Sequence, residues 1–346
     1  MKALYFAEHG DTSKLTYGEL PDPVAKPGHV IIRVRAAAVN QLDLWVLRGW
    51  PGMKLQLPHI GGADITGEVF ALGEGISGWT IGQRVALTPG FLPEGASDEY
   101  SARGEDSLSP AYQIFGETVR GGFAQFVEAP AHTLIALPNS LSFAHAAAPL
   151  LVATTAWRML KHRAAVKSGE TVLIVGSGGG LNSFAIWLAK DLGAKVIALT
   201  STTEKMRRAS ELGANHVLNY RELPDWSREV RLLTGKRGAD VIVDNVGQAT
   251  FPQSLSAAAR GGRIVTVGNS SGYQVTFDNR LMFGKQLSLL GSTMGSAKDA
   301  ADAIAYAWTK PLGKLIDREL PLMDGKQAYD LLDNGEKCGK VVLLPE

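Results

Sequence analysis

The chain has 346 residues, which is enough for two domains of ordinary size with separate hydrophobic cores. Apolar residues make up 45% of the sequence and charged residues 20%, a balance that excludes an intrinsically disordered chain. The formal net charge of +1 gives no support for a nucleic-acid-binding protein or for binding to an anionic membrane.

Neither the apolar runs nor the N-terminus predicts a membrane or secretory segment. The longest apolar runs, such as residues 171–175 and 341–344, are too short to span a bilayer, and no apolar signal-peptide stretch follows Met1. Cys338 is the only cysteine, which excludes an internal disulfide and a metal site built from cysteines. We therefore expect a cytoplasmic protein with neither a membrane nor a nucleic acid as its partner.

The first part of the chain is predicted to be rich in short β-strands. Residues 30–36 form a strand-like run after the turn residues Pro27 and Gly28, and glycines recur between Gly61 and Gly82 at spacings that suit tight turns. Residues 92–108 are polar and have no periodicity, which predicts a surface excursion or a mobile lobe.

From about residue 144 the pattern changes to strands that alternate with helices, as in parallel βαβ units. A capping box is predicted at residues 201–204, where the sequence is Ser-Thr-Thr-Glu. The C-terminal part is predicted to contain two helices and a final strand. The predicted strands are 171–175, 195–200, 217–220, 240–243, 263–267 and 339–344, and the predicted helices are 146–160, 183–192, 204–212, 226–233, 251–259, 298–308 and 327–332.

A glycine-rich loop directly follows the strand 171–175 and directly precedes a helix. Its residues are Gly176, Ser177, Gly178, Gly179, Gly180, Leu181 and Asn182. Glycines at such a turn let the backbone approach a pyrophosphate, whose charge then meets the N–H groups at the helix start. The loop therefore predicts a dinucleotide site, although Asn182 stands where a final glycine would allow close helix–strand packing.

The end of the next strand favours NADP(H) over NAD(H). An NAD-selective site needs an acid there, but Ser201, Thr202 and Thr203 occupy this place, and Glu204 fits a capping role at least as well. Lys205 follows, and the 2′-phosphate of NADP(H) needs cations and hydroxyl donors.

Short motifs recur through the whole chain in a fixed order. They are residues 38–43 (AVNQLD), 62–67 (GADITG), 121–127 (GGFAQFV), the glycine loop, 218–220 (LNY), 244–247 (DNVG), 261–268 (GGRIVTVG) and 339–343 (GKVVL). In this order they resemble the medium-chain dehydrogenase/reductase superfamily, and within it the zinc-independent quinone oxidoreductase-like branch. The resemblance implies an α/β protein with a GroES-like β-rich catalytic domain, residues 1–145 and 292–346, and a Rossmann doubly wound parallel-sheet cofactor domain, residues 146–291.

The resemblance also implies a homodimer, with residues 286–290 extending the sheet across a two-fold axis, and the cofactor in the cleft between the domains. Lys205 and Tyr220 match a lysine and a tyrosine that hold the 2′-phosphate in NADP(H) members of the branch. Further residues are assigned to the cofactor site by the same resemblance: Asn40, Thr155, Asn245, Gly268, Asn269 and Lys340.

Zinc members of the superfamily hold their catalytic metal at positions that match Asn40, Ala63 and Leu151. Asparagine is a poor zinc ligand, and the side chains of alanine and leucine cannot bind zinc. The four cysteines of their structural zinc lobe match Gly95, Asp98, Ser101 and Ser109. His59 is interpreted as a solitary surface or core-edge residue. We therefore expect a protein like the zinc-type alcohol dehydrogenases but without either zinc site.

Without a Lewis acid, a developing alkoxide or enolate needs hydrogen-bond donors. The Asn40 amide is the candidate donor, although an asparagine at this place is also a common turn former. Asp43 is expected to orient a loop or to carry protons, and Trp45 and Trp50 to form a flat apolar wall. Arg48 is open to two interpretations, an anion contact or a helix cap.

The leading functional hypothesis is reduction of a quinone, an enone or another small carbonyl substrate by NADPH, with hydride transfer and no zinc. A zinc-free alcohol dehydrogenase is the first alternative. A non-catalytic NADP(H)-binding redox sensor is the second.

Overall fold

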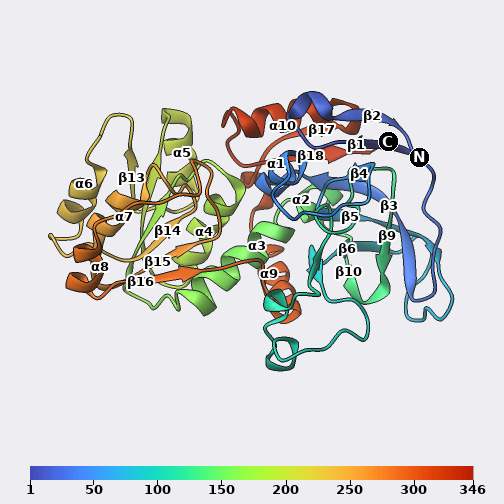
Figure 1. The fold of residues 1–346 in the computed structure, drawn as a ribbon, viewed down its shortest axis with the longest axis horizontal. Helices are drawn as coiled ribbons and strands as arrows, with labels where there is room; N and C mark the ends of the chain where they lie inside the picture. The colour runs from blue at the N-terminus through green and yellow to red at the C-terminus, as the bar shows by residue number, and fades with distance from the viewer. Residues whose placement is uncertain (346) are drawn as a thin grey trace. The chain divides into compact units, whose positions relative to one another are not determined.

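A computed structural model describes residues 1–345, which form two compact units (Figure 1). The first unit comprises Met1–Thr154 and the chain from Gly295 onward, and the second is Thr155–Met294, against the 146–291 expected from the sequence. No helix within residues 1–345 is both long enough and apolar enough to cross a membrane.

The first unit is built from mostly antiparallel sheets. Three strands pair in the order β2 (Thr16–Glu19), β1 (Lys2–Phe6), β4 (His59–Ile60). A larger sheet has the order β10 (Leu134–Ala136), β6 (Arg84–Leu87), β5 (Asp64–Leu72), β3 (His29–Ala38), β18 (Lys340–Leu344), β17 (Ile316–Pro321), and β9 (Phe126–Pro130) also pairs with β3. β7 (Gly90–Phe91) pairs antiparallel with β8 (Gln113–Ile114).

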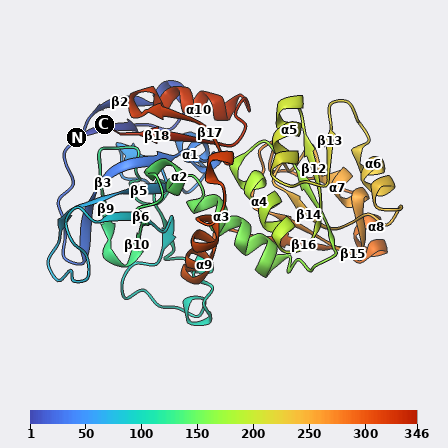
Figure 2. The same ribbon diagram turned by 180° about the vertical axis from the view of Figure 1, so that it is seen from behind.

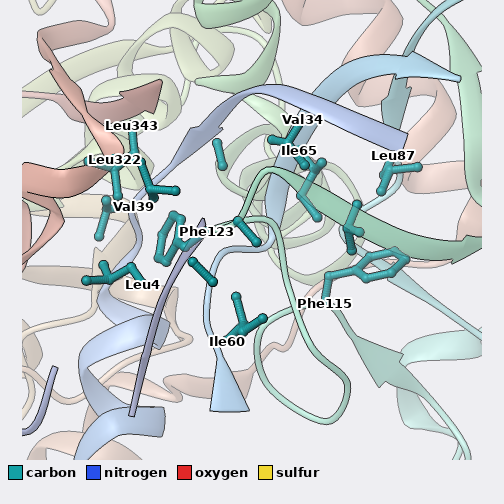
Figure 3. Packing of buried hydrophobic residues seen from close by; sticks show 14 of the residues in the cluster. Leu4, Val34, Val39, Ile60, Ile65, Leu87, Phe115, Phe123, Leu322 and Leu343 are labelled. Atoms are coloured by element: carbon teal, nitrogen blue, oxygen red, sulfur yellow. The ribbon is translucent and has the colours of Figure 1, made fainter. Parts of the chain in front are cut away.

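Both ends of the chain contribute to one hydrophobic core in this unit. Figure 3 shows Leu4 from β1, Ile60 from β4 and Leu343 from β18 in the same packed cluster. This shared core explains why the C-terminal segment belongs to the first unit, since its strand β18 pairs with β3. The helices of this unit are α1 (Gln41–Arg48), α2 (Phe143–Ala147), α9 (Ala297–Ala307) and α10 (Gly325–Asp333).

The second unit holds a six-stranded parallel sheet, seen from behind in Figure 2. Its order is β13 (His216–Asn219), β12 (Lys195–Thr200), β11 (Thr171–Val175), β14 (Ala239–Asp244), β15 (Ala258–Thr266), β16 (Ser288–Gly291). Counted from β11, this is the 3-2-1-4-5-6 order of a Rossmann sheet, so the predicted α/β class is confirmed. The helices are α4 (Gly180–Asp191), α5 (Thr203–Glu211), α6 (Trp226–Leu233), α7 (Phe251–Ala257) and α8 (Asn279–Lys285).

One predicted helix is interrupted. In place of a continuous helix over 146–160, α2 ends at Ala147, α3 (Leu150–Trp157) begins after Pro149, and a π-helical turn follows at Arg158–Arg163. The break has a local cause, because Pro149 has no N–H to donate to the helical hydrogen-bond ladder.

Candidate active site

The glycine loop after β11 is open where a phosphate would approach it. Gly176 has a φ of 80°, a left-handed conformation that favours glycine. A side chain at Gly179 would meet nothing within 4 Å, whereas one at Gly178 would lie 2.9 Å from Lys205 Cδ and Cε and 3.2 Å from its Nζ. The Lys205 ammonium therefore lies over the loop, and α4 begins at Gly180 with its first N–H groups unpaired within the helix. A pyrophosphate fits this cradle.

The floor of the loop is held by β12. Ser177 is buried, and both its backbone N–H and its hydroxyl donate to the carbonyl of Leu199, at 2.8 and 3.1 Å. The Thr200 hydroxyl, at the end of β12, is buried without a hydrogen-bond partner. An unpaired buried hydroxyl beside the loop is consistent with a polar ligand at this edge of the sheet.

The residues expected to bind the 2′-phosphate follow the ends of β12 and β13. Ser201 is buried, Lys205 is half-buried in the first turn of α5, and Tyr220 has a side chain that is 40% exposed. The Tyr220 N–H donates to the Thr200 carbonyl at 3.0 Å, which anchors this tyrosine at the end of β12.

The capping-box prediction for residues 201–204 is wrong. Thr202 is the N-cap of α5, and its hydroxyl accepts from the Lys205 N–H at 3.3 Å. Glu204 is exposed and pairs instead with Arg207 at 3.2 Å. Arg207 also pairs with Glu211, so the guanidinium is neutralised on the helix surface.

The loops after β14 and β15 are tied together. Ser271 donates its N–H to the Val246 carbonyl at 2.8 Å, and the Asn245 amide bonds to Asn182 and to the Val267 N–H. Of the other residues assigned here, Gly268 is partly exposed, Asn269 is exposed, and Thr155 is buried beside the Met294 sulfur at 3.8 Å. Asp244, which the sequence did not single out, is buried and accepts hydrogen bonds from Thr250 and Ser254.

In the first unit, Asn40, Asp64 and Lys340 form a buried polar cluster. The Lys340 ammonium pairs with Asp64 Oδ2 at 2.7 Å and donates to Asn40 Oδ1. The Asn40 amide nitrogen donates to Asp64 Oδ2 at 2.9 Å and to the Ala38 carbonyl at 3.3 Å. Lys340 and Asp64 are 2% and 0% exposed, so the ion pair is fully desolvated.

Asp43 connects this cluster to the loop before β5. Its two carboxylate oxygens accept from the Asn40 N–H at 2.7 Å and from the Gly62 N–H at 2.9 Å. Burial raises the pKa of Asp43 to about 7, although these two backbone bonds lower it. Asp43 thereby fixes the start of α1 against the segment that carries Asp64, which is the orienting role considered for it.

We expect Asp43→Asn to alter the pH dependence of stability. The folded carboxyl binds its proton more tightly than the unfolded one, whose pKa is near 3.8, so its contribution to the unfolding free energy is full below that pH and is lost as pH rises through about 7. The loss is at most about 4 kcal/mol. Urea denaturation of both proteins between pH 4 and 8 measures it, and the same dependence of unfolding free energy on pH in both proteins would contradict the expectation.

His59 contributes in the opposite direction and at lower pH. It is buried in β4 rather than at the surface, its Nε2 lies 3.1 Å from the Gly116 carbonyl, and burial lowers the pKa of His59 to about 4. Its contribution is full above pH 6.5 and is lost as pH falls toward 4. Because wild type and Asp43→Asn both contain His59, its contribution cancels when the two proteins are compared at the same pH.

Comparisons with known proteins give the family. Residues 26–139 match the family described as "Alcohol dehydrogenase GroES-like domain", and residues 180–309 match "Zinc-binding dehydrogenase". The chain is 33% identical to a crotonyl-CoA carboxylase/reductase of Cereibacter sphaeroides, covering 97% of this chain and 85% of the relative. It is 30% identical to a quinone oxidoreductase of Lama guanicoe, covering 99% and 97%.

The chain belongs to the medium-chain dehydrogenase/reductase superfamily. Solved structures agree with this: an NAD-dependent alcohol dehydrogenase has a TM-score of 0.93 and 40% identity, covering 99% of each chain. A crotonyl-CoA carboxylase/reductase in complex with NADP has a TM-score of 0.88 and 26% identity, covering 99% and 94%. The predicted GroES-like and Rossmann domains are confirmed, and the relatives are oxidoreductases of a superfamily that binds nicotinamide cofactors.

The residues at the catalytic zinc positions of this superfamily do not fit zinc. Asn40 is bonded to Lys340 and Asp64, Ala63 is buried and has no donor atom, and the Leu151 N–H donates to Asp64 Oδ1 at 2.6 Å. Asn40 and Leu151 thus bond to the Asp64 carboxylate, and the Lys340 ammonium already neutralises it. Within residues 1–345, no group of three or more His, Cys, Asp or Glu side chains is arranged to hold a metal ion.

The predicted excursion 92–108 lies in the lobe at residues 92–112, between β7 and β8. Hydrogen bonds hold this lobe at the positions that match the zinc-binding cysteines. Asp98 Oδ1 accepts from the N–H groups of Tyr100 and Ser101, both at 2.9 Å, and the Asp98 N–H donates to Ser101 Oγ at 2.9 Å. Hydrogen bonds from Ser109 and Ser101 keep the pKa of Asp98 below its ordinary value. Tyr112 fastens the lobe by donating to the Gly295 carbonyl at 3.0 Å.

The remaining candidates lie on α1 and just beyond it. Trp45 is partly exposed and Trp50 is 43% exposed. Arg48 lies in the last turn of α1 and pairs with Asp333 at 2.5 Å, which is a structural ion pair. Asp64 is the residue that sequence reasoning missed, and the available signal was an acid that directly follows Gly61, Gly62 and Ala63 at the start of a strand.

Proposed function

We propose that this protein is an NADPH-dependent oxidoreductase that transfers a hydride to a quinone, an enone or another small carbonyl substrate without zinc. The observation that carries the NADPH assignment is the Lys205 ammonium lying over the glycine loop, together with the lack of an acid at residues 201–203. The likeness to a crotonyl-CoA carboxylase/reductase in complex with NADP and to quinone oxidoreductases supports it.

Some residues of the proposed site bind the cofactor, and others position the groups that do the chemistry. Bound NADPH would supply the hydride. The N–H groups at the start of α4 hold the pyrophosphate, and Lys205 and Tyr220 hold the 2′-phosphate. Asp43 fixes the position of Asn40.

Asn40 is the proposed donor to the substrate oxygen. Its amide nitrogen has two N–H groups. One donates to Asp64 Oδ2 at 2.9 Å, and the other donates to the Ala38 carbonyl at the longer distance of 3.3 Å. The longer bond is the weaker of the two, so we propose that this N–H is the one that turns to a carbonyl oxygen as negative charge develops on it. Trp45 then offers an apolar surface to a flat substrate.

An alcohol dehydrogenase without zinc is the second candidate. The specific observation in its favour is the likeness to a solved NAD-dependent alcohol dehydrogenase at 40% identity. The first candidate prefers NADPH and reduces a quinone, an enone or another carbonyl, whereas the second prefers NADH and turns over simple alcohols.

The test is a titration of the purified protein with NADPH and with NADH, followed by nicotinamide fluorescence, and then addition of 9,10-phenanthrenequinone or a simple enone. Preference for NADPH and rapid oxidation of it by quinone or enone are expected. Preference for NADH with turnover of simple alcohols would favour the second candidate. Tight NADPH binding without turnover on a broad carbonyl panel would indicate a cofactor-binding sensor.

We also propose a homodimer that forms through β16. Within residues 1–345 this strand is an edge of the parallel sheet and pairs with β15 alone, and Leu289 on it is 39% exposed. Phe283 on α8 is 69% exposed. An apolar edge strand is a template for pairing with a second chain.

Leu289→Lys is expected to convert the dimer to a monomer, because a buried lysine on the joined edge would be left unpaired. Light scattering coupled to gel filtration measures the molar mass. Leu232→Lys, at a 50% exposed leucine on α6, is the matched control and should stay dimeric. A Leu289→Lys protein that remains dimeric would place the interface elsewhere.

A further inference from the structure

Asn182 makes hydrogen bonds where the dinucleotide fingerprint has its last glycine. It is the third residue of α4, and its side chain is buried. Its amide nitrogen donates to the Val175 carbonyl at 2.7 Å and to the Gly176 carbonyl at 3.1 Å. Val175 is the last residue of β11 and Gly176 is the first of the loop. The side chain therefore ties the helix back to the strand end, where a glycine would only permit close packing.

Asn245 extends this connection to two further strands. It directly follows β14, and its amide nitrogen donates to Asn182 Oδ1 at 3.0 Å. Its own Oδ1 accepts from the Val267 N–H at 2.8 Å, directly after β15. The two amides thus join the carboxyl ends of β11, β14 and β15.

This position is where a ligand of such a sheet is expected. β11 and β14 are neighbours in the sheet, and the strand order reverses between them. Dinucleotides bind outside the carboxyl ends of the strands at such a switch point. The paired amides, which we name the asparagine brace (Asn182 and Asn245), cross this point beneath the glycine loop.

The side-chain groups of the brace bond to each other and to the backbone. Both N–H groups of Asn182 donate to carbonyls and its oxygen accepts from Asn245, so its hydrogen-bonding groups are engaged. The Asn245 oxygen is engaged by Val267. Coupled bonds of this kind restrict the groups that they join.

We propose that Asn182 and Asn245 act together as positioning residues that fix the glycine loop for the dinucleotide, with Asn245 acting through Asn182 rather than as a direct cofactor contact. This rests on the dinucleotide binding proposed above. The brace sets the affinity for the shared pyrophosphate, so it affects NADPH and NADH alike.

Asn215 offers a matched control in the same sheet. Its side-chain oxygen accepts from the Val196 N–H at 2.9 Å, and so also ties a loop to a strand. Asn215 precedes β13 and Val196 is near the start of β12, so this bond lies at the opposite, amino-terminal edge. Asn215→Ala removes a similar bond without touching the glycine loop.

The experiment is a double-mutant cycle on the dissociation constant of NADPH, with Asn182→Ala, Asn245→Ala and the double variant. Each single change is expected to weaken binding about tenfold, and the double change no more than the stronger single one. The kcat at saturating NADPH should stay within about threefold, and Asn215→Ala should leave the dissociation constant unchanged.

Two results would overturn the proposal. One is a double variant whose loss equals the product of the single losses, which would mean independent contacts. The other is an Asn182→Gly protein that binds as tightly as the wild type, since glycine restores the fingerprint but not the bonds.

A separate readout distinguishes failure of the brace from failure of the proposed function. Amide hydrogen exchange of the cofactor-free protein should become faster over residues 176–182 in Asn182→Ala and in Asn245→Ala. If the wild type binds neither nucleotide, the proposed function fails, and unchanged exchange in both variants would overturn the brace as well.

Discussion

Replacing Lys340 by methionine is expected to lower the free energy of unfolding by about 3–5 kcal/mol. The change removes the ammonium that pairs with Asp64, whose carboxylate is fully buried 2.7 Å from the lysine, and leaves an uncompensated charge in the core. It also removes the donor to Asn40 Oδ1. Urea denaturation at a fixed pH measures the loss.

The double variant Lys340→Met/Asp64→Leu tests the cause. Removing both charges together should recover part of the lost stability, because no buried charge is left unpaired. Recovery should stay incomplete, because the Asn40 amide and the Leu151 N–H lose Asp64 as their acceptor. Lys298→Ala, in an exposed pair with Asp302, is the control and should change stability by less than about 1 kcal/mol. A loss at Lys340 as small as that of the control would show that water reaches the cluster.

Lys205→Ala is expected to weaken NADPH binding by about 10- to 100-fold and to leave NADH binding nearly unchanged. The side chain is half-buried over Gly178, and a charge-assisted bond to a phosphate is stronger there than at a fully exposed site. Fluorescence titration with both nucleotides measures the two dissociation constants.

Arg207→Ala is the matched control on the same helix, because Glu204 and Glu211 already pair with that guanidinium. It should bind both nucleotides as the wild type does. An equal loss of NADPH and NADH affinity in Lys205→Ala would mean that Lys205 contacts the pyrophosphate, which both nucleotides share, instead of the 2′-phosphate.

The sequence was most informative where structure is determined locally. β11, β12 and α6 begin and end at the predicted residues. The two strands are apolar runs bounded by turns, and the helix shows a helical period after Asp225, so a short stretch of sequence contains each signal. The glycine loop lies between a strand and a helix, as predicted, for the same reason. The helix predicted over 146–160 failed at Pro149, where one residue outweighed an otherwise apolar pattern.

The site itself depends on contacts that no short window contains. Asp64 and Lys340 are 276 positions apart, and Asn182 and Asn245 are 63 apart. Family motifs located Asn40 and Lys340, but nothing in their neighbourhoods showed that one ion pair would engage both. Which N–H meets which carboxylate is fixed by tertiary packing, and a sequence pattern does not carry that information.

The way in which the lobe at residues 92–112 is closed determines the conditions under which it stays folded. A lobe closed by cysteines and zinc depends on the supply of metal and on thiols that stay reduced. Here Asp98 and two serines close it, and these groups are neither oxidised by mild oxidants nor extracted by chelators. The lobe therefore stays closed without a supply of zinc and without reduced thiols.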